Sequence, residues 1–593
     1  MNLILGINAF HGDSAAALLR GGHFSAGVEE ERLNRVKHWA GFPSAAVAEV
    51  LRSGGVSLGD VSAVAVSRDP SAHLMEKVLF AFRRRPSLEA IRSRLANQLK
   101  VASIEGQLEA VGAGRLKGQV YSVEHHLAHL ASAFFCSPFE EAACLTIDGF
   151  GDFLSSMSAV GRGGKLDVLD TVAFPHSLGI FYTAVTQHLG FPKYGDEYKV
   201  MGLASYGRPR YLAELRNVVH LTEDGSFETD MEYFLHATEG VTMSWEGGEP
   251  FIGTLFSPKL VELLGPAREA GSELNERHHD IASSLQAMYE EAFIHRLRWL
   301  HRRTGLKALC LAGGCAMNSV ANGKVFRDTP FTDVFIQSAA GDAGTSLGAA
   351  QYVWHQLMGK PREFVMRHSY WGPEFPETRV VEALRSALPD LPVDPGPWGQ
   401  RMGEFHVARH VDEASLCAET ARAISEGEIV GWYQGRSEWG PRALGNRSIV
   451  VDPRRAEMKE VLNARIKRRE PFRPFAPSIL EEATGEYFEE SYPDPFMIKV
   501  YPIRPEKRSV IPAVTHVDGT GRLQTVSKAQ NPRYWSLIKA FEGITGVPVV
   551  LNTSFNENEP IVNTPEEALA CFLRTKMHRL VMGDWVVSRP GAA

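Results

Sequence analysis

One pattern of short strands occurs twice in the first half of the chain, and it restricts the fold more than any other feature of the sequence. The first copy occupies residues 3–28 and the second occupies residues 142–172. In each copy three short apolar runs are separated first by a polar loop, at 11–13 or 148–152, and then by a tight turn. Short apolar runs bounded by turn residues are typical of strands. We therefore expect two related subdomains, each of which begins with three consecutive strands.

The rest of this half alternates helices and strands. A helical stretch at 280–303 precedes an apolar strand at 308–311, a Gly-Gly turn, a strand at 333–337 and a helix that opens near Ala343. Such alternation predicts parallel strands joined by crossover helices. A duplicated unit of this kind resembles the α/β fold of actin-like and sugar-kinase-like ATPases, which bind nucleotide in the cleft between their halves.

The length of 593 residues predicts at least two domains, because single hydrophobic cores stop growing at about 250–300 residues. Proline and charged residues become frequent around residues 360–376, with the segments PREF and WGPEFPET. Such a composition is typical of a linker. We place the domains at residues 1–362 and 363–593.

Composition restricts the class of protein and its setting. With 44% hydrophobic and 22% charged residues and a net charge of -7, the chain has the make-up of a globular enzyme, and we expect no nucleic-acid partner. Six scattered cysteines without a CxxC pair indicate a reducing, cytoplasmic location. The N-terminus lacks the pattern of a signal peptide and no apolar run reaches about 18 residues, so we expect no membrane association.

A helix-compatible run at 123–134 carries a candidate metal site. His125 and His129 lie four residues apart and therefore face the same side of a helix, where two imidazoles can bind one ion. His126 is also within reach of His129, and an isolated HxxxH is more often a pair of ordinary, partly buried histidines. Asp148 and Asp342 follow strands and can complete the site. Such a set of nitrogen and oxygen ligands suits iron, manganese or zinc better than magnesium.

Two glycine-containing turns in this half are candidate nucleotide contacts. In LAGGCAMN, Gly313 and Gly314 follow a strand, and Asn318 opens a helix whose N-terminus favours phosphate. Most Gly-Gly turns, however, serve packing alone. The segment YGDEYKVMGLASYG places Glu197, Lys199 and Gly202 after another helix, and a surface loop with a solvated Glu-Lys pair is the alternative.

The second half concentrates basic residues among Gly, Pro and Asn rather than along one helix face, which indicates an anion pocket. A strand that ends in LNTSFN presents Asn552 and Ser554 where ligands commonly bind in open sheets, although a plain strand-ending turn is the alternative. His516 is a weaker candidate for the same pocket, and we expect Arg468 to lie in solvent. The basic residues of the central segment are Arg436, Arg442, Arg447, Lys467, Arg468, Arg469 and Arg473.

Together these motifs resemble the NodU/CmcH family of O-carbamoyltransferases along nearly the whole chain. The first half is similar to metal-bearing enzymes that transfer threonylcarbamoyl to tRNA, and the second resembles the YrdC-like α/β fold that forms an adenylate. The combination of GPRALGNRS with FRPFAP is the most specific part of the match. The motifs are INAFHGDSAAAL, EEERLNRVKH, EHHLAHLASAF, the DGFGD turn, KVMGLASYG, LAGGCAMN, GDAGTSLGAA, GRSEWGPRALGNRS, IKRREPFRPFAPSI, THVDGTGRLQTV and LNTSFN.

The resemblance assigns roles to individual residues. It implies that His125, rather than His126, joins His129 at the metal. It makes His11 a catalytic candidate near the acceptor hydroxyl. It makes Lys37 a candidate for nucleotide phosphate, with Arg35 as its competitor. The metal ligands that it implies are His125, His129, Asp148 and Asp342, and the contacts to carbamoyl phosphate and nucleotide are Arg442, Lys467, Arg473 and Arg522, of which Lys467 and Arg473 are catalytic candidates.

The same resemblance implies an order of reactions. Carbamoyl phosphate and ATP, with Mg²⁺, form carbamoyl-adenylate in the second half, and an Fe(II) site in the first half, or one with manganese or zinc, transfers the carbamoyl group to a hydroxyl of a small-molecule natural product. A homodimer is expected from the family. The alternatives are a tRNA-modifying threonylcarbamoyl transferase and a non-catalytic, nucleotide-gated scaffold protein.

Overall fold

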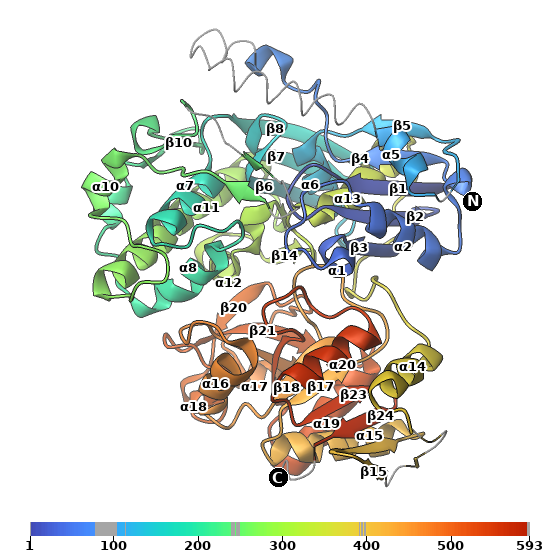
Figure 1. Ribbon diagram of the computed structural model, residues 1–593. Coiled ribbons are helices and arrows are strands. Elements are labelled where there is room, and N and C mark those ends of the chain that lie inside the picture. The colour runs from blue at the N-terminus through green and yellow to red at the C-terminus, as the bar shows by residue number, and fades with distance from the viewer. Residues whose placement is uncertain are drawn as a thin grey trace. The chain divides into compact units, whose positions relative to one another are not determined.

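The computed structural model describes residues 2–77, 104–112, 114–238, 243–244, 250–390, 392, 395–396 and 399–589. The chain divides into two compact units, Met1–Met366 and Arg367–Ala593 (Figure 1). The boundary expected at residues 362/363 falls just before this division. In the described part of the chain, no helix is both long and apolar enough to cross a membrane.

The first unit begins with a five-stranded sheet in the order β3-β2-β1-β4-β5. The first three strands form an antiparallel meander, and β4 and β5 continue the sheet in parallel with β1. The strands are β1 (Leu3–Asn8), β2 (Ala15–Arg20), β3 (His23–Glu29), β4 (Ala63–Val66) and β5 (Gln119–Ser122).

A second sheet in this unit repeats the same topology. Its order, β14-β13-β6-β7-β8, is again a meander followed by two parallel strands on the side of the first strand. The duplication predicted from the two strand patterns is therefore confirmed. The strands are β6 (Glu141–Gly151), β7 (Leu154–Arg162), β8 (Lys165–Ala173), β13 (Ala308–Ala312) and β14 (Asp333–Ile336).

Two short helices, α6 (His125–Phe134) and α13 (Ala343–Tyr352), pack closely against each other, and α13 also packs on β1 and β2. Glycine permits this approach, since a Cβ atom at Gly348 would lie 1.8 Å from the carbonyl oxygen of Ala128. A Cβ atom at Gly6 would lie 1.9 Å from the carbonyl oxygen of Ser346. The start of α13 is therefore held at a fixed place beside α6.

The other helices of the first unit surround these sheets, and short strands join them. The longest helix, α11, begins with a capping box at Asn275. The elements are α1 (Glu31–Asn34), α2 (Ser44–Gly54), α5 (Ile104–Ala110), α7 (Leu178–His188), α8 (Glu197–Leu203), α9 (Leu212–Leu215), β9 (Val219–Leu221), β10 (Phe227–Thr229), β11 (Met243–Ser244), β12 (Phe251–Ile252), α10 (Pro258–Leu264), α11 (Glu276–Thr304) and α12 (Ser319–Asp328).

The second unit is built on a ten-stranded mixed sheet in the order β15-β16-β24-β23-β17-β18-β22-β19-β21-β20. It is an α/β unit as expected, while the more specific YrdC-like assignment stays a prediction. Its strands are β15 (Gln400–Met402), β16 (Phe405–Arg409), β17 (Val430–Tyr433), β18 (Arg447–Val451), β19 (Ala476–Leu480), β20 (Lys499–Pro502), β21 (Thr520–Val526), β22 (Val549–Ser554), β23 (Arg579–Met582) and β24 (Trp585–Ser588).

Helices of this unit pack in pairs, α15 with α19 and α14 with α20. Buried aromatic side chains, among them Trp432, Trp439 and Trp585, fill the core of the unit. The helices are α14 (Glu377–Ala387), α15 (Glu413–Ser425), α16 (Met458–Val461), α17 (Thr484–Tyr487), α18 (Pro505–Arg508), α19 (Pro532–Thr545) and α20 (Pro565–Arg574).

Candidate metal centre and anion site

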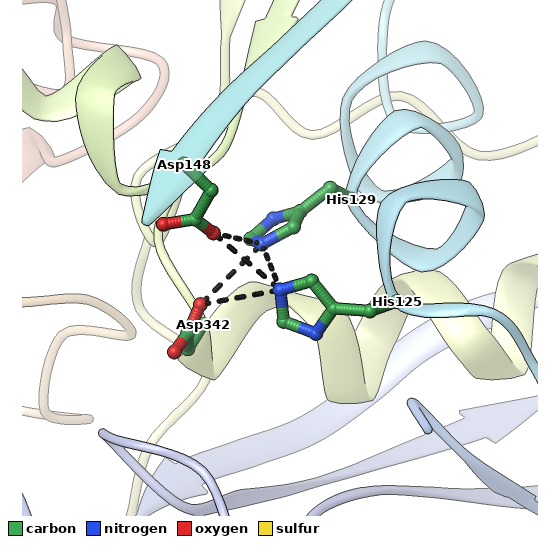
Figure 2. A group of neighbouring side chains, drawn as sticks. All are labelled: His125, His129, Asp148 and Asp342. Carbon is green, nitrogen blue, oxygen red and sulfur yellow. Dashed lines mark hydrogen bonds and ion pairs between the residues drawn. The ribbon is translucent and has the colours of Figure 1, made fainter. Parts of the chain in front are cut away.

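Four side chains converge in the first unit, as Figure 2 shows. His125 and His129 stand one turn apart on α6, and their Nε2 atoms are 3.0 Å from each other. Asp148, near the end of β6, places Oδ2 2.8 Å from Nε2 of His129 and 3.4 Å from Nε2 of His125. Asp342, directly before α13, places Oδ1 3.4 Å and 3.7 Å from the same two nitrogens. The tight packing of α13 on α6 thus completes the cluster.

The donor set fits a transition metal. Ligand atoms about 2.1 Å from an ion in tetrahedral or octahedral coordination lie about 3.0 to 3.4 Å from one another. The four donor atoms here all lie within 4.8 Å of one another, and most pairs fall close to that spacing. Two imidazole nitrogens and two carboxylate oxygens are the mixture expected for iron, manganese or zinc. All four residues are buried or nearly so.

The two carboxylates of this cluster favour a positive charge beside them. Burial alone would lower the pKa of His129, but hydrogen bonds and the charges of Asp148 and Asp342 raise it to about 9. Burial alone would raise the pKa of Asp148, but hydrogen bonds with His125 and His129 hold it well below its usual range. A bound cation would balance the charge of the carboxylates, as a proton on His129 does in its absence.

His126 belongs to the same helix but not to the cluster. Its Nδ1 atom lies 3.3 Å from the hydroxyl of Thr146, and burial lowers its pKa to about 4. The helix period allowed either His125 or His126 as the partner of His129, and the structure brings His125 to it.

His11 lies next to the cluster, in the loop after β1. Its ring stacks on that of His125, with the centroids 4.7 Å apart, and its Nδ1 atom is 3.2 Å from Oδ2 of Asp342. The side chain is 19% exposed, so it is within reach of a substrate. His11, the catalytic candidate that the family resemblance implied, therefore lies beside the four candidate metal ligands.

In the second unit, four arginines gather where neighbouring loops and a strand end meet. Arg442 lies between β17 and β18, Arg469 and Arg473 precede β19, and Arg522 is on β21, the strand that pairs with β19. Burial, followed by the charges of Arg442, Arg469 and Arg473, lowers the pKa of Arg522 well below its usual range.

The Arg522 guanidinium forms no hydrogen bond or ion pair with any residue that the structure describes, and its Nε atom is buried without a partner. A guanidinium held among like charges in this way is costly unless an anion neutralises it. This arrangement is an anion site.

The comparisons with known proteins show the family of the chain. Residues 3–351 match the model of the carbamoyltransferase N-terminus, and residues 421–589 match that of the carbamoyltransferase C-terminus. The chain belongs to the carbamoyltransferase family. It is an O-carbamoyltransferase of the NodU/CmcH type, an enzyme that transfers a carbamoyl group to a hydroxyl.

Relatives of this carbamoyltransferase extend along its whole length. An uncharacterised protein of Synechocystis sp. is 40% identical over 99% of this chain and 97% of its own. The nodulation protein NolNO of Sinorhizobium fredii is 39% identical over 99% of this chain and 80% of its own. The 3'-hydroxymethylcephem-O-carbamoyltransferase of Amycolatopsis lactamdurans is 34% identical over 46% of this chain and 48% of its own. The predicted family and enzyme class are thereby confirmed.

The Gly-Gly turn of the carbamoyltransferase packs closely against Asp148 and the residue before it. Gly313 has φ +93°, and a Cβ atom there would lie 2.2 Å from the carbonyl oxygen of Ile147. A Cβ atom at Gly314 would lie 2.9 Å from Oδ1 of Asp148. Asn318 caps α12 by accepting from the backbone N–H of Ala321 at 3.1 Å. These residues have clear packing and capping roles, and nucleotide contact by them stays a prediction.

Glu197, Lys199 and Gly202 lie on the helix α8 rather than in the expected turn after a helix, and the two charged residues have separate partners. Glu197 accepts a hydrogen bond from the Thr183 hydroxyl at 2.6 Å, and burial raises its pKa. Lys199 pairs instead with Asp196 at 2.8 Å. Gly202 is partly exposed on α8.

Lys37 and Arg35 follow α1, and both are partly buried. Lys37 precedes His38. The positive charge of Lys37 lowers the pKa of His38, but the larger effects of Asp13 and Glu31 raise it. Contact of either residue with nucleotide phosphate stays a prediction.

Lys467 is buried and its ammonium group is surrounded by acceptors of one turn. It donates to the carbonyl oxygen of Asn556 at 2.8 Å, to Oδ1 of Asn556 at 2.7 Å and to the hydroxyl of Ser554 at 3.2 Å. Burial, together with the charges of Arg469 and Arg473, lowers its pKa well below the usual range. This lysine therefore fixes the turn after β22, beside the arginines.

Two further candidates border the arginine cluster. Asn552 donates to the carbonyl oxygen of Ala443 at 3.0 Å and to Gln524 at 2.9 Å, while its Oδ1 atom is buried without a partner. His516 contacts the Thr520 hydroxyl at 3.1 Å, and its Nε2 atom is likewise buried and unpartnered. Burial lowers the pKa of His516 to about 4, so its imidazole is neutral near pH 7.

Not every basic residue of the central segment belongs to the anion site. Arg447 is fully buried and donates to backbone carbonyls of residues 434, 435 and 446. Arg436 donates to those of Trp371 and Gly372. Arg468 is exposed and pairs with Glu557 at 3.1 Å, as expected for a solvated residue. Charge density in the sequence indicated the pocket, but only the fold distinguishes the residues that support it from those that line it.

Asp152 is a supporting residue that the sequence reasoning did not identify. Its Oδ2 atom accepts the backbone N–H of His125 at 3.0 Å and that of Asp69 at 2.7 Å. It thus ties the start of α6 to the loops after β6 and β4. The second aspartate of the DGFGD turn was the available signal.

Proposed function

We propose that the carbamoyltransferase forms carbamoyl-adenylate from carbamoyl phosphate and ATP in its second unit, and transfers the carbamoyl group to a hydroxyl in its first. The observation that carries this proposal is the guanidinium cluster of Arg442, Arg469, Arg473 and Arg522. Guanidinium groups bind phosphate through paired hydrogen bonds, and several together balance the charge of two phosphorylated substrates. Mg²⁺ accompanies the ATP.

In the activating step, one water molecule hydrolyses carbamoyl phosphate to carbamate and phosphate. An oxygen of the carbamate then attacks the α-phosphorus of ATP and displaces pyrophosphate. Arg473 and Arg522 would hold the phosphates in line. Lys467 would keep the turn with Ser554 and Asn556 in place, because its ammonium is already bonded to that turn.

The four-residue centre of the first unit would serve the transfer step. Fe(II), or manganese or zinc, held by His125, His129, Asp148 and Asp342 would polarise the carbamoyl carbonyl and balance the charge of the departing AMP. His11 would accept the proton of the attacking hydroxyl, since it lies beside Asp342 and is partly exposed. The acceptor class that we propose is a small-molecule natural product, an antibiotic or a sugar.

The test is incubation of the full chain with ATP and carbamoyl phosphate without acceptor, followed by measurement of pyrophosphate and of carbamoyl-adenylate by mass spectrometry. Arg522→Ala should reduce the rate at least about 100-fold, the effect of losing one preorganised charge at a transition state. Arg468→Ala, which removes an exposed arginine of the same segment, should keep the wild-type rate. Pyrophosphate release by Arg522→Ala at the wild-type rate would refute the assignment of the activating site.

A further inference from the structure

Tyr194 places a hydroxyl beside the loop that carries His11. The residue lies between α7 and α8, and a Cβ atom at Gly12 would come within 2.2 Å of its hydroxyl oxygen. No side chain other than that of glycine therefore fits at position 12 while Tyr194 holds this position. Gly12 directly follows His11, so the hydroxyl lies against the loop that carries the imidazole.

The phenol ring of Tyr194 is held by a rigid support. It packs edge-on against His38, with the ring centroids 5.4 Å apart and an interplanar angle of 71°. His38 is itself fixed, because Nδ1 lies 2.7 Å from Oδ1 of Asp13 and its backbone N–H donates to Glu31 at 2.9 Å. Gly195 has φ +84° and approaches the His38 ring so closely that a Cβ atom there would be 2.6 Å from Nε2. The position of the hydroxyl is thus set before any substrate binds.

Tyr194 is half-buried, and its hydroxyl forms no hydrogen bond with any part of the chain that the structure describes. Burial, followed by the charges of Asp342, Asp13 and Asp148, raises its pKa well above the usual range. The group therefore stays protonated, as a hydrogen-bond donor near two carboxylates of the four-residue centre. A donor that is held in place and has no partner among the described residues can donate to a bound ligand.

We propose that Tyr194 is a further catalytic residue of the transfer site, whose hydroxyl donates a hydrogen bond to the carbamoyl oxygen as negative charge develops on it. The proposal rests on the proposed function. The acceptor oxygen bonds to the carbamoyl carbon, its proton passes to His11, and the carbonyl electron pair moves onto the oxygen that faces Tyr194. When the carbonyl re-forms, the bond between the carbamoyl carbon and the phosphate oxygen breaks. AMP leaves with the electron pair of that bond.

The variant Tyr194→Phe tests this, because it keeps the ring against His38 and Gly12 and removes only the donor. The first probe is synthetic carbamoyl-adenylate in single turnover with the full chain, where water takes the place of the acceptor and the same oxyanion forms. The second is transfer to any hydroxyl acceptor found in a panel. The turnover rate should fall about 100- to 1000-fold, as when one oxyanion donor is lost, with KM changed less than about threefold. Tyr206→Phe, which alters an exposed tyrosine in the short turn after α8, is the matched control.

Two accompanying measurements separate the outcomes. Pyrophosphate release from ATP and carbamoyl phosphate, and metal content after loading, should equal those of the wild type, because Tyr194 belongs to neither function. A Tyr194→Phe rate within threefold of an active wild type would overturn this proposal alone. A wild type that neither hydrolyses nor transfers carbamoyl-adenylate would overturn the proposed function and this proposal with it.

Discussion

Replacement of His129 by alanine should abolish the thermal stabilisation that a divalent transition metal gives to the protein. His129 is fully buried, and its Nε2 atom is the one nearest to the other three donors of the cluster. Alanine removes one of four ligands and leaves the helix α6 intact. The three donors that remain, from His125, Asp148 and Asp342, then form an incomplete metal site.

The size of the effect follows from linkage. An ion at about 100 times its Kd that binds only the folded state adds about 2.7 kcal/mol of stability. The first unit spans Met1–Met366, and an unfolding entropy of about 2.1 cal/mol/K per residue gives about 0.8 kcal/mol per kelvin for it. The wild type should therefore gain about 3.5 °C in Tm. A 100-fold loss of affinity in the variant reduces the gain to about 0.4 kcal/mol, or half a degree.

The assay is differential scanning calorimetry of metal-free and metal-loaded protein, with Fe(II) under anaerobic conditions and with Mn(II) and Zn(II) in parallel. His126→Ala is the matched control, because His126 is buried on the same helix but bonds to Thr146 outside the cluster. Its baseline Tm should fall while the metal-induced gain persists. An equal gain in His129→Ala and the wild type would refute the assignment of the four ligands.

Three other predictions follow from local geometry. Gly348→Ala should lower the free energy of unfolding by about 1–3 kcal/mol in denaturant titrations, because its Cβ atom would meet a carbonyl oxygen of α6 at 1.8 Å, whereas Gly341→Ala, with open space around it, should change little. Asp152→Ala should lower metal affinity about 10- to 100-fold by isothermal titration, since the carboxylate supports the helix that bears two ligands; unchanged affinity would contradict this. Burial alone would lower the pKa of His38, but Asp13 raises it from 6.5 to about 9, so the pair contributes stability that is complete below pH 6.5 and lost as the pH rises through 9. The difference in Tm between wild type and Asp13→Asn should shrink over that range, and a difference independent of pH would count against the pairing.

The sequence predicted the first unit well because its two meanders carry the same local pattern. Three apolar runs, a polar loop and a tight turn are local signals, and the structure places β1–β3 and β6–β8 there. The metal ligands were harder to choose. Both His125 and His126 are within one turn of His129, and only the position of β6 and α13 decides which imidazole meets Asp148 and Asp342.

Long-range contacts limited the rest of the prediction. Charge density indicated a basic pocket between residues 436 and 473, but Arg447 proved to hold backbone carbonyls and Lys467 to hold the turn after β22. Tyr194 gave no local signal, and the DGFGD turn did not show which segments Asp152 contacts, because each of the two residues acts on a segment elsewhere in the chain. Their roles depend on contacts with Gly12 and with the N–H of His125, which no periodicity encodes.

Activation and transfer should occur at two separate sites of one chain. The most direct test supplies carbamoyl phosphate labelled with ¹⁴C, together with ATP and a panel of hydroxyl acceptors, to the wild type and to Asp148→Asn. The wild type should move the label into an acid-stable O-carbamate with release of AMP and pyrophosphate, whereas Asp148→Asn should still make labelled carbamoyl-adenylate but no O-carbamate. O-carbamate formation by Asp148→Asn at the wild-type rate, or failure of that folded variant to make the adenylate, would contradict a mechanism with two separate sites.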